Sequence, residues 1–194
     1  MKTFMENTVE VWHFLASPEK LANTNESVII GKKYKIEGEP VLCETGYHGS
    51  IRIIDALYYA PGNFLCKRKL SGTIIYGEDK VVGTEMEILS IKNVEKELQL
   101  FARKCALSVA HLWNMPEVVK KYLETGDEKL RTMAREAAWA AAWAAGAAGA
   151  AWEAARAAAW ATGATARGAA WEAALAQQNK LLEEIVKQTE ETHK

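Results

Sequence analysis

The sequence predicts an α+β fold: a small, mostly antiparallel sheet with packed helices, followed by an alanine-rich helical bundle. Composition changes near Gly126, because β-branched and turn residues gather before it and alanine dominates after it. Apolar residues alternate along the first 92 residues, whereas from residue 93 they recur at intervals of three and four. We therefore expect an α+β domain over residues 1–126 and a helical oligomerisation domain over residues 127–194.

The charge balance and the cysteine count limit the class of protein. Among 194 residues, 24 Lys and Arg oppose 25 Asp and Glu, so neither nucleic acid nor an anionic membrane is the expected partner. The three cysteines are widely spaced and odd in number, unlike a disulfide framework. We find no apolar run of signal-peptide or membrane-spanning length. These features predict a cytoplasmic protein.

The N-terminal part contains the signals of a sheet. Alternation over residues 9–16 predicts a first strand, and Ser17 with Pro18 predicts the start of a short helix. Short strands are expected at residues 28–30, 34–36 and 41–43.

Two longer strands are expected at residues 64–76 and 81–91, joined by a turn at residues 77–80. On the second strand, Glu85 and Glu87 alternate with apolar neighbours and should face water. The neighbours that should face the core are Thr84, Met86 and Ile88.

Helix start and stop signals punctuate the chain. Ser50 is a suitable N-cap for a helix over residues 51–59. Asn93 caps an amphipathic helix whose apolar stripe continues to Leu112. A shorter helix begins after Pro116 and ends at Gly126, and Asp127 caps the C-terminal region.

Alanine makes up more than half of residues 134–176, which also contain five of the seven tryptophans. Alanine favours helix, but these tryptophans would not share one face of a straight helix. Gly146, Gly149, Gly163 and Gly168 indicate turns or close helix contacts. A small chain cannot bury all these rings by itself, so we expect a homo-oligomer built through residues 127–194.

The densest group of reactive side chains surrounds His48, which precedes a predicted helix start. Exposed amides at a helix start favour an anion, so this region suits a phosphate or nucleotide. The alternative is a buried histidine that satisfies a turn carbonyl. The cysteine and histidine spacing does not predict a metal site, and we expect no cofactor. The candidate ligand-binding residues are Trp12, His13, His48, Gly49, Ser50, Arg52 and Lys67.

Five motifs lie between residue 9 and about residue 110. They are Trp12-His13-Phe14-Leu15, Gly46-Tyr47-His48-Gly49-Ser50, Asp55-Ala56-Leu57-x-Tyr59-Ala60-Pro61-Gly62, Leu70-Ser71-Gly72 and Asp79-Lys80-Val81-Val82. Together they resemble an uncharacterised family of phages and bacteria, known only as a domain of unknown function. Its members often carry a similar tail rich in alanine and tryptophan. The resemblance implies a phage or prophage accessory protein that works in the host bacterial cytoplasm against host defence.

His48-Gly49-Ser50 is also similar to the element with which some ADP-ribosyltransferases hold NAD. That resemblance implies Tyr76 as the stacking tyrosine and Glu85 or Glu87 as the catalytic glutamate. Our preferred hypothesis is a non-catalytic, oligomeric binder of a small phosphorylated or nucleotide-like ligand, which would sequester a host defence signal. An ADP-ribosyltransferase-like enzyme and a purely structural or protein-interaction module remain the alternatives.

Overall fold

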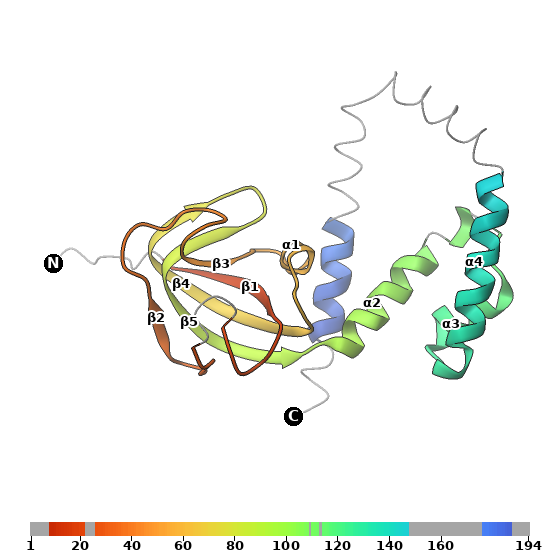
Figure 1. Ribbon diagram of the computed structural model, residues 1–194, viewed down its shortest axis with the longest axis horizontal. Helices are drawn as coiled ribbons and strands as arrows, with labels where there is room; N and C mark the ends of the chain where they lie inside the picture. The colour runs from red at the N-terminus through yellow and green to blue at the C-terminus, as the bar shows by residue number, and fades with distance from the viewer. Residues whose placement is uncertain (1–7, 22–25, 109, 113, 148–175, 188–194) are drawn as a thin grey trace, which may run out of the picture. The chain divides into compact units, whose positions relative to one another are not determined.

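The computed structural model describes residues 8–21, 26–108, 110–112, 114–147 and 176–187 (Figure 1). The chain forms two compact units. The first, which we call the sheet unit, comprises Met1–Lys96 with Leu182–Lys194, and the second comprises Glu97–Leu181. The boundary between these two units reflects which residues pack together, whereas the boundary expected at residue 126 reflects a change in amino-acid composition.

The sheet unit contains a five-stranded antiparallel sheet, which confirms the expected α+β class. The strand order is β1-β4-β5-β2, and β3 pairs with the same strand β5. The strands are β1 (Val9–Leu15), β2 (Lys33–Lys35), β3 (Tyr47–Gly49), β4 (Phe64–Tyr76) and β5 (Val81–Asn93).

The long hairpin of β4 and β5 is the centre of the sheet, and both strands occur where the sequence predicts them. Its turn is closed by a hydrogen bond of 2.8 Å from the Gly77 amide to the Lys80 carbonyl. Met86 and Ile88 are buried in the core, as the alternation predicts. The core also contains Val11, Leu15, Tyr34, Cys66, Leu70 and Val81.

The end of β3 connects back to β1, so that the sheet curls toward closure. The Trp12 amide donates to the Ser50 carbonyl at 2.7 Å, and the Ser50 amide donates to the Trp12 carbonyl at 2.8 Å. Gly49 packs directly on Val11 at this junction. The closure brings residues 12–13 and 48–50 together, although they are far apart in the sequence.

Two of the predicted short strands are wrong. Residues 28–30 form no strand, and residues 41–43 belong to a turn that is closed by the pairing of Val41 with Thr45. Cys43 adopts a positive φ of 67° in that turn, which a strand would not allow. The short helix expected after Ser17 is also absent from the described residues, because Lys20 pairs with Ser27 and the Leu21 amide donates to the Glu26 carbonyl instead.

The helix expected to start at Ser50 begins later. Helix α1 (Ile53–Tyr58) has Arg52 as its N-cap, without a side-chain capping hydrogen bond. Ser50 cannot cap it, because Ser50 is buried and its backbone pairs with β1. The six residues of α1 therefore do not provide the helix-terminal anion site that the sequence suggests.

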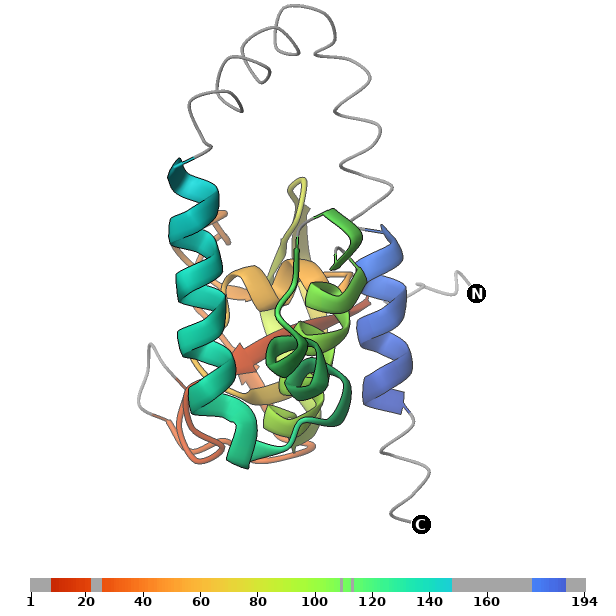
Figure 2. The same ribbon diagram turned by 90° about the vertical axis from the view of Figure 1, so that its right-hand side faces the viewer.

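The other helix signals agree with the structure. The Asn93 carboxamide accepts the Glu95 amide at 3.0 Å at the start of α2 (Glu95–Ser108), which ends earlier than its apolar stripe predicts. Gly126 ends α3 (Glu117–Thr125) with a φ of 68°. Asp127 caps the short 3-10 helix η2 (Glu128–Leu130), which leads into α4 (Arg131–Ala147). Within the second unit, α3 and α4 pack against each other (Figure 2).

The C-terminal segment returns to the sheet unit. Residues 176–187 are helical, and Leu182, Ile185 and Val186 are buried. The Lys92 ammonium donates to the Val186 carbonyl at 3.4 Å. Part of the expected bundle, residues 148–175, lies outside the described residues, so assembly through residues 127–194 stays a prediction. In the described part of the chain, no helix is long and apolar enough to cross a membrane.

Candidate functional site

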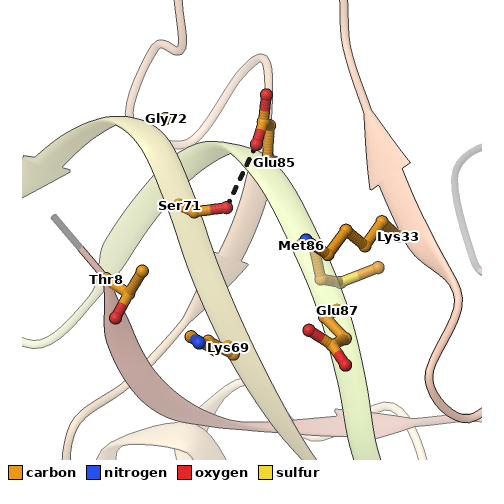
Figure 3. A pocket seen from close by; sticks show the side chains of 8 residues that line it. All are labelled: Thr8, Lys33, Lys69, Ser71, Gly72, Glu85, Met86 and Glu87. Carbon is orange, nitrogen blue, oxygen red and sulfur yellow. Dashed lines mark hydrogen bonds between the residues drawn. The ribbon is translucent and has the colours of Figure 1, made fainter. Parts of the chain in front are cut away.

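The sheet unit contains two cavities of about 270 Å³ each. We call the first the imidazole cavity; it is lined by Trp12, His13, Cys43, Glu44, His48, Gly49, Ser50, Ala56, Tyr59 and Lys80. We call the second the charged cavity (Figure 3); it is lined by Thr8, Lys33, Lys69, Ser71, Gly72, Glu85, Met86 and Glu87.

The closure of β3 onto β1 brings most of the candidate residues together. Trp12, His13, His48, Gly49 and Ser50 all line the imidazole cavity. They come from two strands that are joined by the backbone pair between Trp12 and Ser50. The wall that these five residues form therefore depends on pairing between segments that are far apart in the sequence.

The two expected cations, Arg52 and Lys67, do not line this cavity. Arg52 binds the Asp55 carboxylate through two hydrogen bonds, of 2.7 and 2.8 Å. Lys67 forms an ion pair of 2.6 Å with Glu10 and lies 5.5 Å from the centre of the Trp12 ring. The structure therefore places Arg52 and Lys67 beside acidic partners and outside the lining of the imidazole cavity.

Both ring nitrogens of His48 hold the preceding turn. Nε2 accepts the Cys43 amide at 3.0 Å, so we assign the ring proton to Nδ1, which donates to the Gly46 carbonyl at 3.1 Å. Burial lowers the pKa of His48, which favours this neutral form. His48 therefore satisfies a turn carbonyl, the alternative that the sequence left open, and only its ring faces the cavity.

His13 is the second neutral imidazole. Burial, followed by the nearby Arg68 and His48, lowers its pKa from 6.5 to about 3. Arg68 is itself buried, and it donates to the His48 carbonyl at 3.2 Å. Its Nε is the one buried side-chain polar atom without a hydrogen-bond partner among the described residues. A buried guanidinium thus supports the strand that carries His48 and opposes protonation of both histidines.

Lys80, from the turn expected at residues 77–80, is the cation that does line the imidazole cavity. Lys80 Nζ lies 3.7 Å from the centre of the Tyr59 ring and 3.5 Å from Cys43 Sγ. The Tyr59 hydroxyl donates to Asp79 at 2.5 Å. The cavity therefore has one ammonium and one carboxylate, Glu44, rather than a cluster of cations.

The cysteines and acidic residues do not form a metal site in the described part of the chain, where no three potential ligands gather. Cys66 is buried in the core, and burial raises the pKa of its thiol. In this position Cys66 packs as a small buried hydrophobe.

The residues implied by the ADP-ribosyltransferase resemblance do not meet. Glu85 and Glu87 line the charged cavity, whereas His48, Gly49 and Ser50 line the imidazole cavity. Tyr76 lines neither cavity and is exposed at the end of β4. A single NAD site built from these groups has no counterpart in this geometry.

No family model, curated protein or solved structure matches the chain.

Proposed function

We propose that the protein is a non-catalytic binder of a small phosphorylated or nucleotide-like molecule, held in the imidazole cavity. The observation that carries this proposal is the convergence of five candidate residues and Lys80 on one cavity. In that cavity, aromatic side chains lie beside a single ammonium group.

The lining residues indicate the chemistry of the ligand. Trp12 offers an aromatic surface on which a planar base can stack, and Tyr59 adds a second ring, one face of which is covered by Lys80. The Lys80 ammonium, over the face of the Tyr59 ring, can contact a phosphate. The volume of about 270 Å³ is at the small end of the range for ligand cavities, which favours a mononucleotide over a dinucleotide.

The state of the imidazoles favours binding over catalysis. A general base needs an available nitrogen with a pKa near the working pH. His48 uses both ring nitrogens within its own turn, and the pKa of His13 is about 3. Neither group has the properties of an acid–base catalyst at neutral pH.

The proposed role in the cell rests on the resemblance to the phage and bacterial family. A phage-derived protein of this kind would sequester a host signal, and the alanine-rich residues 127–194 would join several copies.

The test is native mass spectrometry of the full chain purified from bacterial cells, alongside Lys80→Gln and the control Lys129→Gln. Lys129 is exposed and lies in η2, outside the imidazole cavity. We expect the unaltered protein and Lys129→Gln to retain a phosphorylated molecule, and Lys80→Gln to lose it. Mononucleotides should also raise the melting temperature of the two retaining proteins, because a ligand that binds the folded state stabilises it. Absence of both a retained molecule and a melting shift would overturn the proposal.

A further inference from the structure

The charged cavity lies on the outer face of β2, β5 and β4, away from the core. Leu70 and Met86 are buried, although Met86 also lines part of this cavity, and the alternating residues Lys69, Ser71, Glu85 and Glu87 lie on the other face of their strands. Figure 3 shows these side chains around the hollow, with Lys33 reaching across from β2 toward β5.

The backbone itself shapes this hollow. The register between β4 and β5 shifts between Ser71 and Ile74, and Gly72 has a φ of 77°. A Cβ at Gly72 would collide with the Thr84 hydroxyl, which accepts the Thr73 amide at 3.1 Å. Such irregularities often re-aim side chains beside functional sites. The irregular backbone at Ser71 and Gly72 therefore forms part of the cavity wall.

Two rows of side chains cross the cavity, and they differ in how their charges are satisfied. In one row, the Glu85 carboxylate binds Lys35 at 3.0 Å and the Ser71 hydroxyl at 3.2 Å. These contacts, the Lys35 contact first, lower the pKa of Glu85. The charge of Glu85 in this row is therefore satisfied by other residues of the protein.

In the other row, Glu87 is the register partner of both Lys33 and Lys69. Cross-strand neighbours at this spacing are close enough to pair. Among the described residues, however, none of the three has a side-chain hydrogen bond or ion pair. The cavity thus presents a carboxylate between two ammonium groups, and none of the three forms a hydrogen bond or ion pair in the described part of the chain, although Lys33 is close enough to Glu85 to lower the pKa of that carboxyl.

We propose that the charged cavity binds an acidic α-amino acid. Its two carboxylates would contact Lys33 and Lys69, and its ammonium would contact Glu87. Neighbouring strands are about 4.8 Å apart, so the two lysines start roughly 10 Å apart and can converge on a short dicarboxylate. The charge order of the ligand (negative, positive, negative) complements that of the row. Solvent-exposed ion pairs contribute little each, so the expected affinity is millimolar.

Nuclear magnetic resonance on the full chain tests this site. We would titrate L-glutamate, L-aspartate, glutarate and 4-aminobutyrate separately while following backbone amides of residues 69–72 and 85–87. The two amino acids should give saturable shifts there. Glutarate lacks the ammonium and 4-aminobutyrate lacks the second carboxylate, so each should bind roughly fivefold more weakly, the factor expected for one exposed ion pair.

Substitutions distinguish specific binding of the amino acid by the cavity residues from a general effect of surface charge. Glu87→Gln should weaken L-glutamate binding roughly fivefold and leave glutarate unchanged or stronger. Lys35→Gln is the matched control, because Lys35 is already paired and does not line the cavity. No saturable shift with either amino acid, equal binding of glutarate and L-glutamate, or an equal loss in Lys35→Gln and Lys33→Gln would each overturn the proposal.

Discussion

The two cavities of the sheet unit have the same volume, about 270 Å³, but they differ in how several of their ionisable groups are satisfied. In the imidazole cavity, burial keeps His13 and His48 neutral, and the ring nitrogens of His48 are used by the protein. In the charged cavity, Lys33, Lys69 and Glu87 form no hydrogen bond or ion pair among the described residues, although Lys33 is close enough to Glu85 to lower the pKa of that carboxyl.

Burial accounts for the neutral state of the two histidines. Because burial penalises charge, the imidazoles of His13 and His48 at the junction of β1 and β3 stay neutral. On the outer face of the same sheet, water stabilises each charge, and separate ammonium and carboxylate groups can coexist without pairing. The first cavity therefore suits shape, stacking and one anionic contact, and the second suits a ligand with matching charges.

The largest expected effect is a loss of stability of the sheet unit, which contains both cavities. Leu182 is fully buried and belongs to the sheet unit, so Leu182→Ala should lower the free energy of unfolding by about 2–5 kcal/mol. Urea unfolding measures this loss, with the exposed Lys180→Ala as control. A loss below about 1 kcal/mol would show that the C-terminal segment does not pack in the sheet unit.

A smaller loss of stability should differ between substitutions in the walls of the two cavities. A Cβ at Gly49 would lie 2.8 Å from Val11 Cβ and 3.0 Å from the Trp12 carbonyl oxygen. Gly49→Ala should therefore cost about 1–3 kcal/mol through overpacking at the wall of the imidazole cavity. This occurs even though alanine usually suits a strand better than glycine. Ser71→Ala, in the charged cavity, should cost much less, and equal losses in the two variants would contradict the contrast.

The smallest effect concerns pH. The pKa of His13 is about 3 in the folded protein, against 6.5 ordinarily, so the unfolded chain takes up a proton first as pH falls. The stability that depends on neutral His13 is complete above about pH 6.5 and is lost progressively toward pH 3. Between about pH 7 and pH 5.5 the free energy of unfolding should fall by roughly 1 kcal/mol.

His13→Gln should remove most of this pH dependence, and chemical denaturation at the two pH values measures it. His111→Gln replaces an exposed histidine and should retain the slope. The same slope in His13→Gln and the unaltered protein would show that another group is responsible.

Local patterns were enough to predict the long elements. The alternation along β4 and β5 and the helix signals at Asn93, Gly126 and Asp127 depend on neighbouring residues, and the structure agrees with all of them. Strand β3 was missed because its three residues are held by partners on β5 and β1 that are distant in sequence. The same closure turns Ser50 from an apparent helix cap into a buried bridge residue.

The candidate site was predicted in part, for physical reasons. Closeness in the sequence grouped His48, Gly49 and Ser50, which line one cavity, whereas the predicted cations Arg52 and Lys67 do not line it. The pair Arg52 and Asp55 is spaced three residues apart on a helix start, which is a readable signal for mutual neutralisation. Lys80 carried no such signal, because its place over Tyr59 depends on how the hairpin end meets α1.

The most direct test of the account is a nuclear magnetic resonance titration of the imidazole signals of His13 and His48 in the folded chain. We expect His13 to remain neutral from about pH 8 down to about pH 5, because burial and Arg68 hold its pKa at about 3. We also expect His48 to keep its proton on Nδ1 over this range. A folded protein in which His13 protonates with a midpoint near the ordinary 6.5 would contradict the neutral, buried site on which the proposed function rests.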